Sequence, residues 1–176
     1  MTTNKLKEKI QESLKKGKKS QDLLLKLLEK EGYSCGLPTK EQDMYEHWDI
    51  VTILEEGKGL VRIDVKGLKQ LTEDGQAWIE LINVHGDIGW LYAPKLHTIA
   101  FERDDCFIFI RREDLIPIVE EKIKEFEEIN GRGLCFLKSE LKSYQRYSRV
   151  LSGRSDEMIK MPFSDFEHLT YKKTYK

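Results

Sequence analysis

The sequence predicts a single α/β domain in which a β-sheet of about five strands lies between helical segments. Two observations carry this prediction. Apolar residues near the two ends recur at helical spacing, whereas those between residues 48 and 110 fall in short runs rich in β-branched residues. The length of 176 residues is typical of one domain. Within it we distinguish a core at about 20–131 from a C-terminal extension at 132–176.

Three helices are predicted. A short amphipathic helix at 5–16 ends at Gly17, and a second helix begins with Ser20 as its N-cap and ends at Gly32. A third helix covers about 114–129. The stripe of the second helix, which should pack on the sheet, consists of Leu23, Leu24, Leu27 and Leu28.

The strands follow from β-branched runs bounded by turn residues. We predict five of them, at 48–54, 60–65, 78–84, 97–101 and 106–110. The turn Glu56-Gly57-Lys58-Gly59 indicates that the first two form a hairpin, and Arg103-Asp104-Asp105 joins the last two. After the third helix we expect only a short strand at 158–161 and a helical turn capped by Ser164.

Composition excludes several classes of protein. Lys and Arg number 30 against 31 Asp and Glu, so the net charge is −1 and any charge argument must be local. No apolar stretch approaches the roughly 18 residues of a membrane span, so we expect no membrane association and a cytoplasmic location. Three cysteines without CxxC spacing, Cys35, Cys106 and Cys135, are expected to be reduced thiols.

Two neighbouring strands carry acids in an unusual arrangement. Alternation in the strand at 60–65 puts Asp64 and Lys66 side by side on one face and Val61, Ile63 and Val65 on the other. Asp49 is a lone carboxylate at the start of an otherwise apolar run, where a charge is costly without a partner. If the two strands pair as a hairpin, Asp49 and Asp64 converge at the same end.

Two carboxylates and an ammonium at one point suit metal-dependent phosphodiester cleavage. Hard oxygen ligands hold Mg²⁺ or Mn²⁺, the ion polarises the phosphate, and a lysine offsets the developing negative charge. The simpler alternative is a solvated strand face on which Asp64 and Lys66 form a surface ion pair worth about 0–1 kcal/mol.

The Asp–x14–Asp–x–Lys spacing resembles the PD-(D/E)xK nuclease superfamily. The similarity extends over roughly 20–110 and includes blocks seen in small phage-type members: His47-Trp48-Asp49-Ile50, Ile63-Asp64-Val65-Lys66-Gly67, Trp78-Ile79-Glu80-Leu81, Gly89-Trp90-Leu91-Tyr92 and Ile99-Ala100-Phe101-Glu102. The resemblance implies a central mixed β-sheet flanked by helices, the restriction-endonuclease-like α/β/α core.

The same resemblance implies roles for individual residues. Asp49 and Asp64 would be metal ligands, Lys66 the catalytic lysine, and the carbonyl of Val65 a third ligand. Many members add a glutamate from the first core helix, where this chain has Gln21 or Asp22, with Glu29 two turns later. Glu80 on the next strand is the substitute ligand if none of these serves.

Other residues have simpler interpretations. His47 and His85 lie close to the predicted site, but a histidine beside a strand end is more often a hydrogen-bonded structural group. Gly86, Gly89 and Trp90 predict a turn and a core anchor rather than a phosphate cradle, because no helix N-terminus follows Gly89.

A basic run at 132–154 is the predicted nucleic-acid contact, because lysines and arginines neutralise phosphates and tyrosines stack on exposed bases. The residues that we expect to bind are Lys142, Tyr144, Arg146 and Arg149. The alternative is a solvated helix.

The sequence therefore leaves two hypotheses open. The first is a Mg²⁺-dependent nuclease of phage or mobile-element type that acts on DNA, whether duplex, branched or single-stranded. The second is a catalytically inactive nucleic-acid-binding or protein-interaction module on the same fold. The intact Asp49, Asp64 and Lys66 favour the first, and the missing helix glutamate favours the second. A homodimer is compatible with both.

Overall fold

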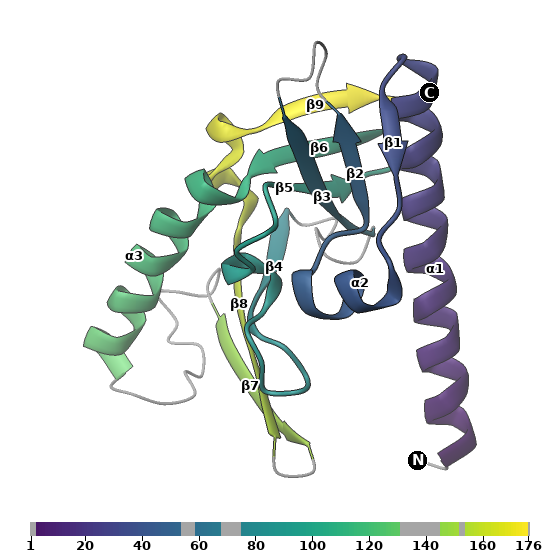
Figure 1. Ribbon diagram of the computed structural model, residues 1–176. Coiled ribbons are helices and arrows are strands. Elements are labelled where there is room, and N and C mark those ends of the chain that lie inside the picture. Colours follow the sequence, from purple (N-terminus) through teal and green to yellow (C-terminus); the bar gives the residue numbers. More distant parts are fainter. Residues whose placement is uncertain (1–2, 54–58, 68–74, 131–144, 152–153, 176) are drawn as a thin grey trace.

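The protein is an α/β structure with three α-helices and nine strands among the residues described by the computed structural model (Figure 1), which are 3–53, 59–67, 75–130, 145–151 and 154–175. The helices are α1 (Thr3–Lys30), α2 (Lys40–Glu46) and α3 (Arg112–Asn130). The strands are β1 (Ser34–Gly36), β2 (Ile50–Ile53), β3 (Leu60–Lys66), β4 (Gln76–Ile82), β5 (Thr98–Glu102), β6 (Cys106–Arg111), β7 (Gln145–Leu151), β8 (Arg154–Pro162) and β9 (Tyr171–Thr174).

The strands form two sheets. The larger is mixed, with the order β1-β2-β3-β5-β6-β9, and its one parallel pair is β3 with β5, in which Asp64 lies opposite Ile99. The smaller is antiparallel, with the order β4-β8-β7. The predicted hairpin is confirmed, because β2 and β3 are antiparallel with Ile50 opposite Ile63.

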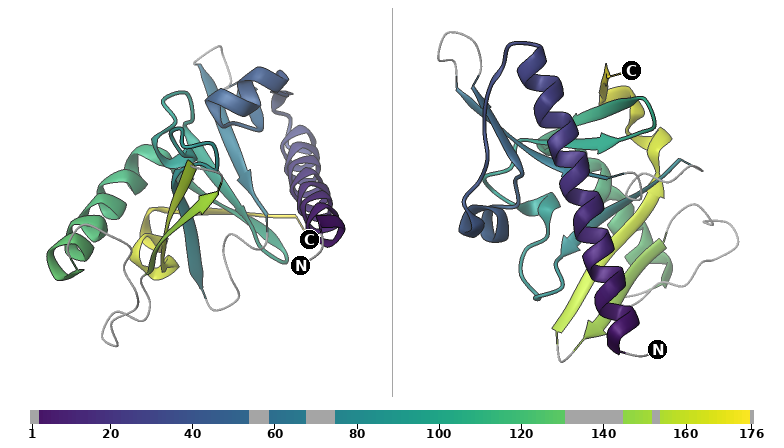
Figure 2. Two further views of the ribbon diagram at one scale, coloured as in Figure 1. Left: turned by 90° about the horizontal axis from the view of Figure 1, so that it is seen from below. Right: turned by 90° about the vertical axis from the view of Figure 1, so that its right-hand side faces the viewer.

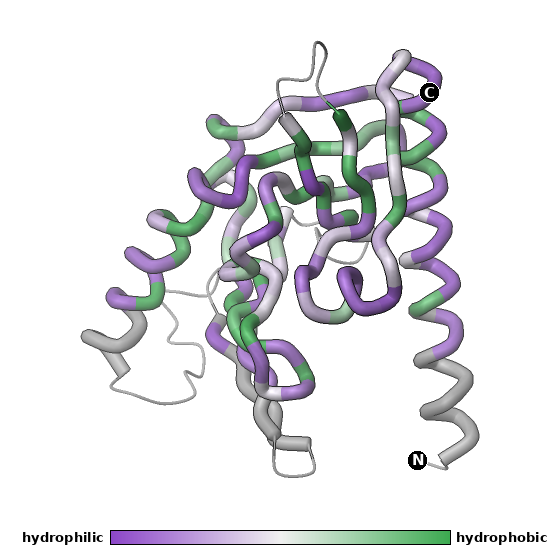
Figure 3. Tube along the Cα trace, viewed as in Figure 1, coloured by the Kyte–Doolittle hydropathy of each residue, from purple (hydrophilic) through white to green (hydrophobic). Residues whose placement is uncertain are grey.

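Two apolar clusters lie on opposite faces of the larger sheet. On one face, α1 packs through Leu24 and Leu28 against Ile63 and Val65. On the other, β4, β8 and α3 enclose the larger cluster, which includes Phe101. Figure 2 shows α1 and α3 on opposite sides of the molecule, and Figure 3 shows hydrophobic residues concentrated along β5 and β6. Among the described helices, none has both the length and the apolarity that crossing a bilayer would need.

The predicted break at Gly17 is wrong, because α1 is one continuous helix of 28 residues. Ser20 is not an N-cap: its hydroxyl lies 3.1 Å from the Lys16 carbonyl and also within hydrogen-bond distance of the Glu102 carboxylate on β5, and its one hydrogen can be donated to either acceptor. A glycine inside a helix costs about 1 kcal/mol relative to alanine. That cost alone does not end a helix whose next two turns are buried.

The prediction of about five strands was too low. Strand β1, the C-terminal strands β7 and β9 and helix α2 were missed, whereas the strand expected at 158–161 lies inside the longer β8. Helix α2 begins with a capping box, in which the Thr39 hydroxyl accepts from the Gln42 N–H and the Gln42 side chain accepts from the Thr39 N–H. The turn expected after Ser164 consists of the 3₁₀ turns Phe163–Asp165 and Glu167–Leu169.

Candidate functional site

Asp49 and Asp64 lie at the same end of the β2–β3 hairpin. Asp49 directly precedes β2, and its N–H donates to the Ile63 carbonyl at 2.8 Å, so this residue extends the ladder between the two strands. Asp64 is the next residue on β3. The structure therefore brings the two carboxylates together, as the alternation and the hairpin predicted.

The Asp49 carboxylate is held by the backbone of the opposite strand. Its Oδ2 accepts a hydrogen bond of 2.7 Å from the Val65 N–H. Burial raises the pKa of Asp49 to about 7, and the Asp64 charge adds to the rise, whereas the Val65 N–H and the Lys66 ammonium oppose it. Near neutral pH, Asp49 is therefore only partly ionised.

Asp64 and Lys66 form a largely buried ion pair. Lys66 Nζ lies 2.7 Å from Asp64 Oδ2, and the two side chains are 18% and 8% exposed, respectively. This distance is that of an ion pair, yet Oδ2 has no partner that meets hydrogen-bond geometry. The alternative of a surface pair on a solvated strand face is therefore wrong, because both side chains lie largely inside the protein.

The Val65 carbonyl points toward the Asp49 side of β3. Within a strand, the N–H and C=O of one residue point to the same edge, and consecutive residues point to opposite edges. The Val65 N–H reaches Asp49, whereas the Arg62 N–H and C=O reach His97 on the β5 side. Since the β2–β3 register runs only from Leu60 to Ile63 on β3, the Val65 carbonyl lies beyond the last paired residue, on the edge of β3 from which Val65 N–H reaches Asp49.

Glu80, on β4 of the smaller sheet, lies in the electrostatic surroundings of the two acids. Burial is the main cause that raises the pKa of Glu80, and the Asp64 charge adds to the rise. Lys66, the Trp90 N–H and His47 partly oppose it. Its carboxylate therefore lies within electrostatic reach of Asp64 and Lys66, and the backbone of Trp90 donates to it.

The segment that brings Trp90 to Glu80 depends on a glycine. A Cβ on Gly89 would lie 2.6 Å from the Glu80 carbonyl oxygen, which is far inside van der Waals contact. The Gly89 N–H donates to the Leu81 carbonyl at 2.9 Å, so the chain crosses β4 at close range. The sequence signal was Gly89-Trp90, which we interpreted as a turn and a core anchor. Trp90 is indeed a core residue, at 2% exposure, but its backbone N–H also interacts with the Glu80 carboxylate.

Aromatic rings hold the basic side chains of this face. Lys66 Nζ lies 5.0 Å from the centre of the Trp90 ring, and the Arg62 guanidinium lies 5.8 Å from that of Trp48. His47 ends α2 in the left-handed region, with φ of 53°, an uncommon conformation outside glycine. This turn leads directly into Trp48 and Asp49.

Of the residues that we considered on the first core helix, only Gln21 contacts the site. Its Nε2 donates to the Asp49 carbonyl at 2.8 Å. Asp22 instead pairs with Lys18 on the outside of α1 at 3.3 Å, where its side chain is 50% exposed. Glu29 is exposed and its charge acts on Cys35 in β1. The structure therefore places the two acids, Asp22 and Glu29, outside the site.

The predicted basic nucleic-acid contact is only partly described. Lys142 and Tyr144 lie outside the described residues. Arg146 and Arg149 lie on β7, so the solvated helix that we considered as the alternative is wrong for this part of the run. Arg146 forms an ion pair of 3.1 Å with Glu157 and is 18% exposed, and Arg149 is opposite Asp156 in the β7–β8 register. The Arg146 guanidinium is thus already engaged inside the smaller sheet.

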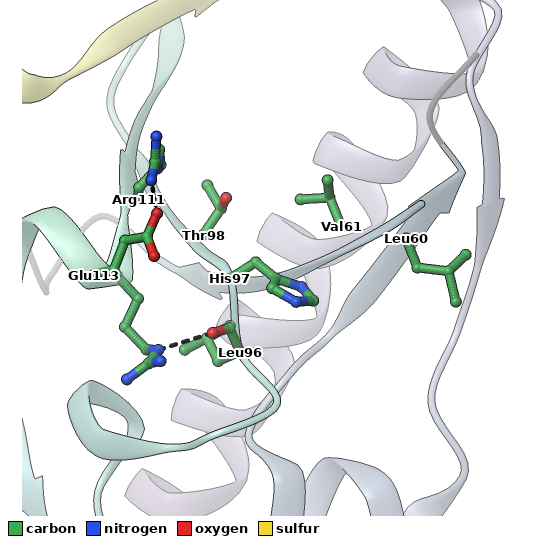
Figure 4. Close-up of a pocket in the computed structure, with 8 residues that line it drawn as sticks. Leu60, Val61, Leu96, His97, Thr98, Arg111 and Glu113 are labelled. Atoms are coloured by element: carbon green, nitrogen blue, oxygen red, sulfur yellow. Dashed lines mark hydrogen bonds and ion pairs between the residues drawn. The ribbon is translucent and has the colours of Figure 1, made fainter. Parts of the chain in front are cut away.

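Two cavities lie away from the carboxylates. The first, of about 250 Å³, is at the start of β3 (Figure 4), whereas Asp64 lies towards the end of this strand. Its polar groups have protein partners, since Arg111 contacts Glu113, and the Arg112 Nε donates to the Leu96 carbonyl at 2.8 Å. The second, of about 400 Å³, is a groove between α1 and β9.

The acids fit a divalent ion of the magnesium type, although no group of three or more His, Cys, Asp or Glu side chains in the described part of the chain is arranged as a metal centre. Mg²⁺ commonly uses only one or two carboxylates and keeps several waters. Asp49 and Asp64 supply two, the Val65 carbonyl lies on the edge of β3 next to Asp49, and Asp64 Oδ2 is buried with no partner that meets hydrogen-bond geometry. A cation here would also offset the two main causes that raise the pKa of Asp49, which are burial and the nearby Asp64 charge.

Comparison with protein-family models, curated proteins and solved structures finds no match for this chain.

Proposed function

We propose that the protein is a metal-dependent nuclease that hydrolyses DNA phosphodiester bonds, with Mg²⁺ or Mn²⁺ as its cofactor. One observation carries the proposal: Asp49 and Asp64 converge from adjacent strands, with Lys66 ion-paired to the second acid on the same face. The mixed sheet with α1 on one face agrees with the restriction-endonuclease-like core that the sequence resemblance implies.

The proposed mechanism assigns metal binding to the acids and stabilisation of charge to the lysine. Asp49, Asp64 and the Val65 carbonyl would hold the metal, and Glu80 would reach it from the smaller sheet. The bound ion neutralises phosphate charge and lowers the pKa of water. Lys66 donates hydrogen bonds to the attacking water or to a non-bridging phosphate oxygen, and so offsets the negative charge that grows on the phosphate.

The surroundings keep these groups in place. Asp64 and the Trp90 ring limit the motion of the Lys66 side chain. Gln21 fixes the backbone of Asp49, and the Val65 N–H fixes its carboxylate. Such positioning supports catalysis because a reacting group that is already oriented loses less entropy on reaching the transition state.

A second candidate is an inactive nucleic-acid-binding or protein-interaction module on the same fold. It is favoured by the absence of a three-ligand metal group in the described residues and by Gln21 in place of an acid on α1. In that case the Lys66–Asp64 pair is only structural.

The experiment combines cleavage with metal binding. Purified protein is incubated with linear, branched and single-stranded DNA in Mg²⁺, Mn²⁺ or EDTA, and binding of the ion to the protein alone is measured by calorimetry. We expect cleavage that needs the metal and that Asp49→Asn, Asp64→Asn and Lys66→Met each abolish. The two Asp variants should also lose metal binding, whereas Lys66→Met should keep it.

Asp43→Asn is the matched control, because this exposed carboxylate in the first turn of α2 should affect neither readout. Cleavage that survives in all three site variants would remove these residues from the mechanism. Metal binding without cleavage of any substrate would favour the inactive module.

A further inference from the structure

The N-terminal half of α1 extends past the larger sheet (Figure 1). Every side chain that the structure describes between residues 11 and 19 is exposed, and Leu14 is 68% exposed, whereas Leu24 and Leu28 in the second half are buried. We call residues 3–19 the α1 arm. Most of the stability of a helix in a protein comes from the packing of one face. The described side chains of the arm at 11, 12 and 14–19 are exposed and are therefore accessible to a partner.

The arm concentrates positive charge. Its sequence has seven lysines and two glutamates, a net charge of +5, whereas the rest of the chain has 23 basic and 29 acidic residues, a net charge of −6. Lys16 pairs with Glu12, and Lys18 pairs with Asp22. Lys15 and Lys19 are exposed and form no ion pair with a residue that the structure describes. Such a helix repels itself and attracts a polyanion.

The arm begins where α1 passes the candidate site. Gln21, which contacts Asp49, accepts a hydrogen bond of 3.3 Å from Lys18, and Lys15 lies one turn further out. At a rise of 1.5 Å per residue, the distance from Lys5 to Lys19 along the helix is about 21 Å. That length matches roughly six base pairs of DNA at 3.4 Å each.

We propose that the α1 arm binds the phosphate backbone of duplex DNA beside the Asp49–Asp64 site. The inference rests on the proposed function and specifies its substrate as DNA with a double-stranded flank. Lysine contacts with phosphates carry no sequence information, so the arm holds any duplex, and its contribution weakens as the salt concentration rises.

Two double variants of the full chain isolate the arm. Lys15→Gln/Lys19→Gln removes two exposed lysines four residues apart from the arm. Lys26→Gln/Lys30→Gln removes two exposed lysines with the same spacing from the packed half of the same helix. The change in net charge is identical. Affinity for a 20-base-pair duplex is measured by fluorescence anisotropy from 50 to 200 mM salt, with Ca²⁺ in place of Mg²⁺ to prevent cleavage.

We expect the arm variant to bind more weakly and its salt slope to fall by about two, so that the loss of affinity between 50 and 200 mM salt becomes about tenfold smaller. The control variant should keep the wild-type slope. Equal losses in both variants would mean that only net charge matters, and would overturn the proposal. A wild-type dimer in light scattering that the arm variant alone loses would show a subunit interface, and would also overturn it.

The measurements distinguish a failure of the α1 arm proposal from a failure of the nuclease proposal. If the wild type cleaves DNA and the arm variant binds duplex as the wild type does, the arm has no such role but the nuclease proposal stands. If the wild type neither binds nor cleaves any DNA, both proposals are removed. Circular dichroism that matches the wild type ensures that a weaker variant is still folded.

Discussion

Replacing Asp49 by asparagine should stabilise the metal-free protein at alkaline pH. The folded protein raises the pKa of this carboxyl from 3.8 to about 7. Each tenfold change in proton affinity corresponds to about 1.4 kcal/mol, so keeping Asp49 ionised above pH 8 costs roughly 4 kcal/mol at most. Asparagine carries no charge, and its side-chain oxygen can still accept from the Val65 N–H.

The sign of the pH dependence follows from the direction of the shift. A carboxyl with a raised folded pKa favours the folded state fully below its unfolded pKa, and that stability is lost as the pH rises through the folded pKa. The wild type should therefore lose stability relative to Asp49→Asn between about pH 4 and pH 8. Because the side chain keeps some contact with solvent, we expect a difference of about 2–4 kcal/mol at pH 8.5 and little at pH 4.

The assay is urea unfolding in EDTA at a series of pH values, with Asp43→Asn as the control. This exposed acid in the first turn of α2 should change the stability by less than about 1 kcal/mol. Repeating the pH 8.5 series in Mg²⁺ should stabilise the wild type and leave Asp49→Asn unchanged. An asparagine variant less stable than the wild type at pH 8.5, or a difference that does not change with pH, would refute the reasoning.

Three further substitutions test the packing around the site by urea unfolding. Gly89→Ala should destabilise the protein by about 2–4 kcal/mol, because the new Cβ would meet the Glu80 carbonyl at 2.6 Å; a neutral effect would contradict the close crossing of β4. Gly17→Ala should instead add about 0.5–1 kcal/mol, since nothing lies within 4 Å of its Cβ in an exposed helix, and a loss would mean that the arm is not helical there. Ser20→Ala should cost about 1–3 kcal/mol by leaving the Glu102 carboxylate without its hydroxyl donor, and an unchanged midpoint would show that this bond is not formed.

Local patterns predicted the centre of the site. The alternation of residues 61–66 specified the two faces of β3, and a charge at the start of the apolar run of β2 singled out Asp49. The pairing of these strands then followed from the short turn between them. Helical phase also distinguishes Gln21 from Glu29, since only Gln21 lies beside the stripe of Ser20, Leu24 and Leu28 that packs inward.

The features of the site that the sequence did not predict depend mainly on contacts between distant parts of the chain. The basic residues of β7 suggested a surface, but Glu157 on the neighbouring strand engages Arg146. No periodicity in residues 145–151 reveals that partner. The role of the Trp90 N–H was equally hidden, because it depends on the chain crossing β4 at Gly89. The capping box at Thr39 was visible in the sequence, and α2 could have been predicted from it.

The order of strands has a consequence for how far the protein can be shortened. Strand β8 lies between β4 and β7, and β9 forms the edge of the larger sheet beside β6. A chain cut after α3 would leave β4, which carries Glu80, with no neighbour in its own sheet, and would uncover the β6 edge. The described residues after α3, which belong to the last quarter of the chain, form no hydrogen bond or ion pair with the two central acids, but their strands complete both sheets. Deletion mapping would therefore report loss of folding there, and such a loss should not be interpreted as the loss of a binding region.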